Sequence, residues 1–234
     1  MNSEGLPVDP VLVEQIQERA AALRARWQER TDREVRLVCV TKAHGPEVAA
    51  AALAAGLQDL GENYAQELAA KAALLALHPP AGTEPRWHFI GQLQRNKVRL
   101  VAPHAAWWHT LDRAPLVDEV ARRAPGARVL VQLDLAGAAG RGGCDPTDAP
   151  ALVARARDAG LEVLGLMGVA PPGPPESARA GFRLLVEIAD DLGLPERSIG
   201  MSGDADVAVE EGATVVRVGA ALVGPRPAVR RGPE

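Results

Sequence analysis

The sequence predicts an α/β protein folded as a single closed (β/α)8 barrel of the TIM type, with an extra helix at its amino end. Short apolar runs alternate with segments of helical periodicity along the chain. Eight such units follow one another over roughly 200 residues without a long linker. One domain is therefore expected over residues 1–234, with a core from about residue 10 to 225. An open doubly wound sheet is the alternative that this alternation also allows.

The first expected element is a helix over residues 8–30, in which Val11, Ile16, Leu23 and Trp27 form a rough apolar stripe. Because no strand precedes it, this helix should pack outside the barrel. The expected strands are short apolar runs bounded by Gly, Pro or Asp. They cover residues 35–41, 58–62, 86–91, 107–111, 128–134, 162–169, 198–201 and 214–219. The expected helices cover residues 46–55, 64–77, 113–124, 147–159, 176–192 and 204–211, and only the third connection is short.

Composition narrows the classes of function. The net charge is -4 and no basic stripe is interleaved with aromatic residues, which argues against nucleic-acid binding. Cys39 and Cys144 are lone thiols that suit a reducing cytoplasm. No signal segment or membrane-spanning apolar run is present in the sequence, so a soluble protein is expected. The five histidines are scattered without the spacing of a metal site, and no metal is predicted.

Lys42 is the first candidate functional residue. It closes the β-branched run 35–42, whose alternation aims the amine from the carboxyl end of a strand toward the barrel mouth. A lysine becomes nucleophilic near neutral pH when burial or neighbouring cations lower its pKa, so this position suits a Schiff-base lysine. The alternative is a lysine that marks the solvated end of a strand.

A phosphate site is expected after the last two strands, where barrel proteins commonly bind phosphate. Ser202 follows the seventh strand, and its hydroxyl could bind an anion together with the free amides of Gly203 and Asp204. Alternation along the eighth strand turns Arg217 and Gly219 inward, and the amides of Gly219 and Ala220 add donors. An ordinary helix cap and a rim arginine are the structural alternative.

A lysine facing a phosphate site, with an arginine between them, is the arrangement that pyridoxal 5'-phosphate (PLP) requires. Its aldehyde would condense with Lys42, and Arg217 would donate a hydrogen bond to the ring nitrogen. Because arginine stays cationic, that nitrogen would remain unprotonated and the ring would be a weaker electron sink. The pattern therefore favours tight holding of the cofactor over turnover.

Several motifs of the chain resemble consecutive signatures of the pyridoxal phosphate homeostasis proteins. They are LVCVTK (37–42), GENY (61–64) followed by QE (66–67), WHFIGQLQRNK (87–97), HTLDR (109–113), GLM (165–167), GMSGD (200–204) and RVG (217–219). The resemblance runs from about residue 10 to 225, and the HFIGQLQRNK block is highly specific.

This resemblance implies a single-domain barrel, similar to the N-terminal domain of alanine racemase, that binds PLP without established catalysis. Members are thought to buffer the cofactor or to deliver it in transient contacts with apo PLP enzymes. The implied cofactor-binding residues are Lys42 (Schiff base), Asn63 and Met167 (ring), Arg217 (ring nitrogen), and Ser202, Gly203, Gly219 and Ala220 (phosphate). No apolar stripe is left over for a dimer interface, so a monomer is expected.

Two positions depart from the family pattern, and rival functions remain open. His44 stands where many members carry a second lysine, and Ala220 replaces a frequent Ser or Thr. A PLP-dependent amino-acid racemase or decarboxylase is the main rival. Racemisation needs a second acid–base group, and the single tyrosine, Tyr64, is expected to be packed at a helix start. A Schiff-base aldolase is a third possibility.

Overall fold

The computed structural model describes residues 6–78, 84–137 and 142–225. Eight parallel strands pair in chain order, and β8 pairs with β1 to close the barrel. The strands are β1 (Arg36–Val40), β2 (Asp59–Glu62), β3 (Arg86–Phe89), β4 (Ala105–Leu111), β5 (Arg128–Leu133), β6 (Glu162–Gly168), β7 (Glu196–Ser198) and β8 (Val215–Val218). The predicted closed barrel is confirmed, and the open sheet is excluded.

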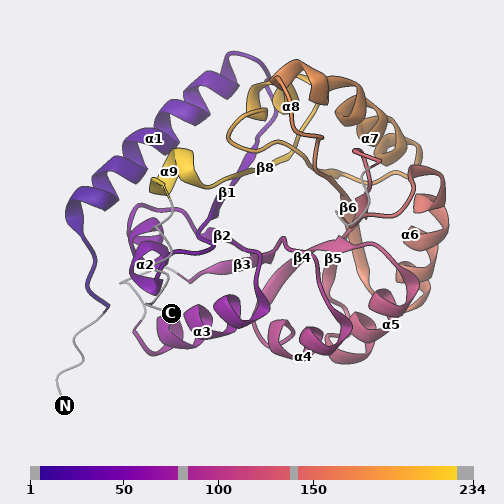
Figure 1. The fold of residues 1–234 in the computed structure, drawn as a ribbon, viewed down its shortest axis with the longest axis horizontal. Helices are drawn as coiled ribbons and strands as arrows, with labels where there is room; N and C mark the ends of the chain where they lie inside the picture. The colour runs from indigo at the N-terminus through magenta and orange to yellow at the C-terminus, as the bar shows by residue number, and fades with distance from the viewer. Residues whose placement is uncertain (1–5, 79–83, 138–141, 226–234) are drawn as a thin grey trace, which may run out of the picture.

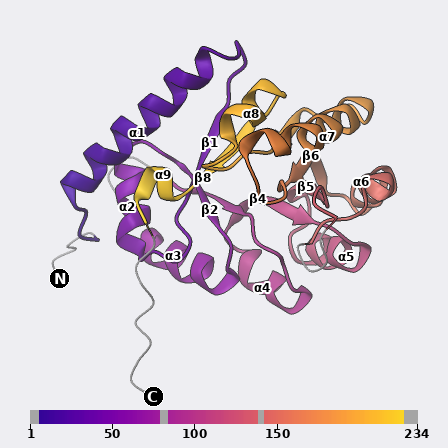
Figure 2. The same ribbon diagram turned by 45° about the horizontal axis from the view of Figure 1, so that its top comes forward.

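Helices surround the strands in an outer ring (Figure 1). They are α1 (Pro10–Gln28), α2 (Pro46–Ala54), α3 (Ala65–Leu77), α4 (Val98–Val101), α5 (Ala114–Arg123), α6 (Ala149–Asp158), α7 (Arg179–Asp191), α8 (Ala205–Glu210) and α9 (Ala220–Val223). As expected, α1 lies outside the barrel, where it packs beside α2 and α9 (Figures 1 and 2). Asp9 caps it, and of the predicted stripe Ile16 and Trp27 are buried whereas Val11 is exposed.

The prediction for the seventh strand was wrong in its bounds. Residues 198–201 were expected in the strand, but β7 ends at Ser198, the first of them. Gly200 has a φ of 90°, which lies in the left-handed region and is incompatible with an extended strand. The chain therefore turns sooner than its apolar pattern suggests, and α8 starts after the turn, as predicted.

Alternation along the strands separates two apolar layers. Residues that point outward pack against the helices in the large core, as Val216 and Val218 of β8 do. Residues that point inward form a smaller cluster inside the barrel, made of Val38, Trp107, Leu130, Met167 and Val215. None of the helices in the described segments combines the length and the apolarity that crossing a bilayer requires.

Candidate functional site

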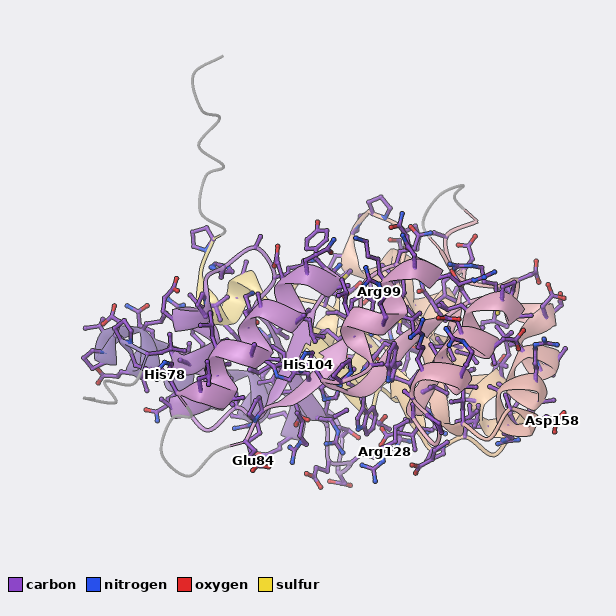
Figure 3. The ribbon with its side chains drawn as sticks, turned by 90° about the horizontal axis from the view of Figure 1, so that it is seen from below. His78, Glu84, Arg99, His104, Arg128 and Asp158 are labelled. Carbon is purple, nitrogen blue, oxygen red and sulfur yellow. The ribbon has the colours of Figure 1, made fainter. Side chains whose placement is uncertain are left out.

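All strands of a closed parallel barrel end on the same side, so the loops after them form one face. The carboxyl-end face carries Lys42 after β1, Asn63 after β2, Ser202 and Gly203 after β7, and Gly219 and Ala220 after β8. Glu84 and Arg128, which precede or start strands, mark the opposite edge in the side view (Figure 3). The topology thus places these six predicted cofactor residues at one end of the molecule.

Lys42 is partly buried and lies in a turn two residues after the end of β1, whose Val38 and Val40 lie beside Gly61. The next residue, Ala43, has a φ of 61°, in the left-handed region that a residue with a side chain rarely adopts. The amide of Ala43 donates a hydrogen bond of 2.8 Å to Oε2 of Glu67. This strained turn is therefore held from α3.

A buried ion pair fixes the other side of Lys42. Lys71 of α3 is only 4% exposed, and its Nζ donates to the carbonyl oxygen of Thr41 at 2.7 Å and to Oε1 of Glu62 at 2.6 Å. The hydroxyl of Thr41 donates to the same carboxylate oxygen at 2.7 Å. Burial raises the pKa of Glu62, and the ion pair with Lys71 opposes this shift. The backbone on both sides of Lys42 is thereby held by α3.

Arg217 points into the barrel, as predicted, and is 4% exposed. Its NH1 donates to the carbonyl oxygen and to Oγ of Ser198 at 2.6 and 2.5 Å, and its NH2 donates to the carbonyl oxygen of Gly168 at 2.9 Å. Burial lowers the pKa of Arg217 to about 10, against the attraction of Asp204, so the guanidinium stays protonated at neutral pH. These bonds leave two of its five N–H groups for other acceptors.

The loops after β7 and β8 supply donors for an anion. Asp204 closes a tight turn by accepting a hydrogen bond of 2.6 Å from the amide of Met201, and Ser202 and Gly203 lie exposed on that turn. A Cβ added at Gly203 would meet no atom within 4 Å. Gly219 and Ala220 begin α9, where the first amides have no partner within the helix. The turn at Gly203 is open and Ala220 is exposed, whereas Gly219 packs against Val40, so a phosphate group could approach the backbone most freely at Gly203 and Ala220.

The remaining two predicted residues lie at different depths. The Oδ1 atom of Asn63 is buried and accepts no hydrogen bond from the described residues, so this atom is a candidate acceptor for a ligand. Met167 is 1% exposed and packs inside the barrel with Val38 and Val215, below the mouth. Tyr64 stands at the start of α3 as its N-cap residue, as expected, but its side chain is 56% exposed, so the prediction that it is packed was wrong.

Two cavities open near these loops. One of about 450 Å³ lies between the loops after β5, β6 and β7, and its lining includes Gly203, Asp204 and the proline-rich segment 171–175. The other, of about 390 Å³, is lined by Asn63 and Tyr64 together with residues that follow β3. Neither Lys42 nor Arg217 is among the described residues that line these two cavities.

Sequence reasoning missed Lys71 and Ser198. It also missed the hydrogen-bond partners of His88 in β3 and His109 in β4. The spacing of Glu67 and Lys71, four residues apart on an alanine-rich helix, was a signal that could have identified Lys71. Ser198 and its contacts could not have been found in this way, because the register between strands that are distant in sequence cannot be read from the chain.

Comparisons with known proteins agree with this geometry. The family model described as alanine racemase, N-terminal domain, matches residues 13–227. The pyridoxal phosphate homeostasis protein of Pseudomonas aeruginosa is 40% identical over 200 residues, which cover 82% of this chain and 85% of that protein.

Solved structures of related proteins have the same fold. The structure of PipY from Synechococcus elongatus with PLP bound superposes with a TM-score of 0.79 at 33% identity, covering 89% of this chain and all of that one. Alanine racemase from Streptomyces coelicolor superposes with a TM-score of 0.69 at 26% identity. The match covers 90% of this chain but only 58% of the racemase, so much of the enzyme has no counterpart here.

Proposed function

Because the chain belongs to the family of pyridoxal phosphate homeostasis proteins, we propose that it binds PLP as a Schiff base on Lys42 and serves in vitamin B6 homeostasis. Its role would be to buffer the cofactor or to deliver it, without catalytic turnover. The observation that supports the proposal is the pairing of β1 with β8, in which Val38 lies opposite Arg217, so that the loop carrying Lys42 begins beside the strand of Arg217.

The other residues fit the cofactor as follows. The amides of Gly203, Gly219 and Ala220, with the hydroxyl of Ser202, would bind the phosphate in the loops after β7 and β8. The buried Oδ1 of Asn63, which has no hydrogen-bond partner among the described residues, would face the ring from the loop after β2. Met167 would lie beneath the ring as part of the barrel interior. The single domain over residues 1–234 is part of this proposal.

Arg217 would determine whether the bound cofactor is only held or is also active in catalysis. When bound, PLP supplies an aldehyde for the lysine amine and an electron-withdrawing ring. The two N–H groups that Arg217 retains would donate to the ring nitrogen and keep it unprotonated, which weakens the ring as an electron sink. The exposed position of Tyr64 offers no fixed second base, which argues against the racemase alternative.

The proposal extends to partners and location. We expect a cytoplasmic monomer that meets apo PLP enzymes transiently through the carboxyl-end face of the barrel, where the cofactor would be exchanged. The two cysteines, Cys39 and Cys144, are both buried free thiols, which agrees with a reducing compartment.

The test is the visible absorption spectrum of the protein after incubation with PLP, followed by borohydride reduction and peptide mapping. The sequence contains three lysines, Lys42, Lys71 and Lys97, so the position of the adduct is easily resolved. We expect an imine band and a reduced adduct on Lys42, lost in Lys42→Ala and retained in the control Lys97→Ala. An adduct elsewhere, or none, would overturn the proposal.

A further inference from the structure

A continuous line of polar side chains crosses the interior of the barrel. It starts at Arg217 of β8, passes through Ser198 of β7, His109 of β4 and His88 of β3, and ends at Asp59 of β2. Apart from Arg217 and Asp59, both nearly buried, its members are 0% exposed. These residues come from five strands and take no part in the phosphate site or the lysine loop.

Every link of this line has hydrogen-bonding length. Ser198 Oγ lies 2.5 Å from NH1 of Arg217 and 2.9 Å from Nδ1 of His109. Nε2 of His109 lies 2.9 Å from Nδ1 of His88, whose Nε2 lies 2.9 Å from Oδ1 of Asp59. No water is needed to join them, because each side chain reaches the next directly.

With both rings neutral, the carboxylate of Asp59 fixes the direction of every bond, because a carboxylate can only accept. His88 then donates from Nε2–H to Asp59 and accepts at Nδ1 from Nε2–H of His109. His109 in turn accepts at Nδ1 from the hydroxyl of Ser198, whose oxygen accepts from Arg217. The bonds therefore all point one way, from Arg217 to Asp59.

Electrostatics support this assignment. Burial, together with repulsion from neighbouring cationic groups, lowers the pKa of His109 well below its usual value. Burial also lowers the pKa of His88, against its bond to Asp59. Although burial alone would raise the pKa of Asp59, its hydrogen bonds to Arg86 and His88 outweigh this and hold the pKa well below its usual range. Asp59 is thus ionised and both rings are neutral at neutral pH.

The distant end is anchored at the amino end of the barrel. Arg86 holds the Asp59 carboxylate with two bonds of 2.9 and 2.8 Å, and NH1 of Arg36 lies 3.7 Å away. The Arg36 guanidinium in turn lies over the ring of Trp107, 4.9 Å from its centroid. A cavity of about 660 Å³, lined by Arg36, Asp59 and Arg86, lies at this end.

We propose that this line is a positioning device, in which Asp59, His88, His109 and Ser198 orient the Arg217 guanidinium so that its remaining N–H groups face the ring nitrogen of the cofactor. The inference rests on the proposed binding of PLP. Ser198 occupies NH1 through both its hydroxyl and its carbonyl oxygen, so the plane of the guanidinium is fixed from one side. His109 and His88 act only through Ser198, and they need not touch the cofactor.

The bond direction is tested first, by NMR of the histidine ring nitrogens in the PLP-loaded protein. We expect both His88 and His109 to carry their proton on Nε2 and to stay neutral at neutral pH. A proton on Nδ1 of either ring, or a cationic ring, would overturn the directed arrangement. This readout does not depend on where PLP is attached.

The effect on Arg217 is tested with PLP labelled with 15N at the ring nitrogen. Ser198→Ala removes the hydroxyl, and His109→Met removes both ring nitrogens, so each interrupts the line. His109→Gln can still accept from Ser198 and donate to His88, and it should restore the line. The matched control is His104→Gln, whose side chain lies outside the barrel (Figure 3).

We expect Ser198→Ala and His109→Met to raise the Kd for PLP about tenfold and to shift the ring-nitrogen signal toward that of a pyridine without a hydrogen bond. His109→Gln and His104→Gln should stay within about twofold of the wild type. Wild-type values in the first two variants would overturn the positioning role. Failure of PLP binding itself would be recognised separately, as the absence of a reduced adduct on Lys42 in the wild type.

Discussion

Two buried polar clusters support the candidate site, and they use charge in opposite ways. The lysine-loop cluster (Thr41, Glu62, Glu67 and Lys71) brings opposite charges into direct contact beside Lys42. The interior line (Arg217, Ser198, His109, His88 and Asp59) separates its two charges by three neutral groups. The first arrangement stabilises the strained backbone at Ala43, whereas the second is proposed to orient the Arg217 guanidinium.

This difference predicts how each cluster fails. Removal of one partner from a contact ion pair leaves a buried charge without compensation, and the cost falls on folding. Interruption of a neutral hydrogen-bonded line leaves unpaired donors and acceptors, each of which costs less. Variants of the lysine-loop cluster should therefore act mainly on stability, and variants of the interior line mainly on the state of Arg217.

The largest effect is expected for Lys71→Met. Glu62 would keep its burial but lose the ammonium at 2.6 Å, so the free energy of unfolding should fall by roughly 3 to 5 kcal/mol. Denaturant titration measures this, with Lys97→Met as the control because Lys97 forms part of a short 3-10 turn outside the barrel. A loss below about 1 kcal/mol would show that the ion pair is not what holds the lysine loop.

The next prediction compares a buried and an exposed Asp–Arg ion pair of the same two-bond geometry. Asp59 and Asp118 each bind an arginine through two bonds, but the Asp59 side chain is 10% exposed and the Asp118 side chain 52%. Asp59→Asn should cost roughly 1.5 to 3 kcal/mol of unfolding free energy and disturb the histidine tautomers. Asp118→Asn should cost less than about 1 kcal/mol. Equal losses would contradict the special role of the interior end.

Acid should weaken the interior line. In the folded protein, the pKa values of His88 and His109 lie below their usual 6.5. Below pH 6.5 the two histidines are therefore protonated in the unfolded chain but still neutral in the folded protein. Stability therefore falls as pH falls through 6.5, by about 1.4 kcal/mol per pH unit for each histidine, until the folded pKa is reached.

The measurement compares unfolding free energies at pH values of about 7.5 and about 5.5 in the wild type and in His109→Gln. The variant should lose the share of the pH dependence that belongs to His109. Glu62, whose pKa is raised, contributes with the opposite sign but equally in both proteins, so the difference isolates His109. An unchanged slope in His109→Gln would contradict a neutral, buried His109.

The fold could be predicted because periodicity is a local property. Each strand and long helix carries its own alternation, and the expected bounds mostly agree with the structure to within two or three residues. The helices α4 and α9 are four residues long, too short to show a period, and were not predicted as separate elements. The bounds of β7 failed because the left-handed φ of Gly200 is not visible in an apolar run.

A site residue could be predicted only where the local sequence pattern around that residue indicates its position. Alternation predicted an inward Arg217, and this agrees with the structure, whereas Lys42 lies in the turn after β1 and its orientation stays a prediction. The interior line depends on the register of β2, β3, β4 and β7 against one another, which no local pattern contains. Alternation puts His88 and His109 inward, but it cannot tell that Nδ1 of one meets Nε2 of the other.

The smallest expected effect tests the limits of the lysine-loop cluster. Glu67 lies 3.7 Å from the ammonium of Lys71, with its side chain 34% exposed, and it accepts the amide of Ala43. Glu67→Gln keeps an oxygen for that amide and loses only a screened charge, so the unfolding free energy should change by less than about 0.5 kcal/mol. A loss as large as that of Lys71→Met would mean that the turn at Ala43 depends on the charge of Glu67. The strain at Ala43 would then be balanced by electrostatics rather than by the hydrogen bond alone.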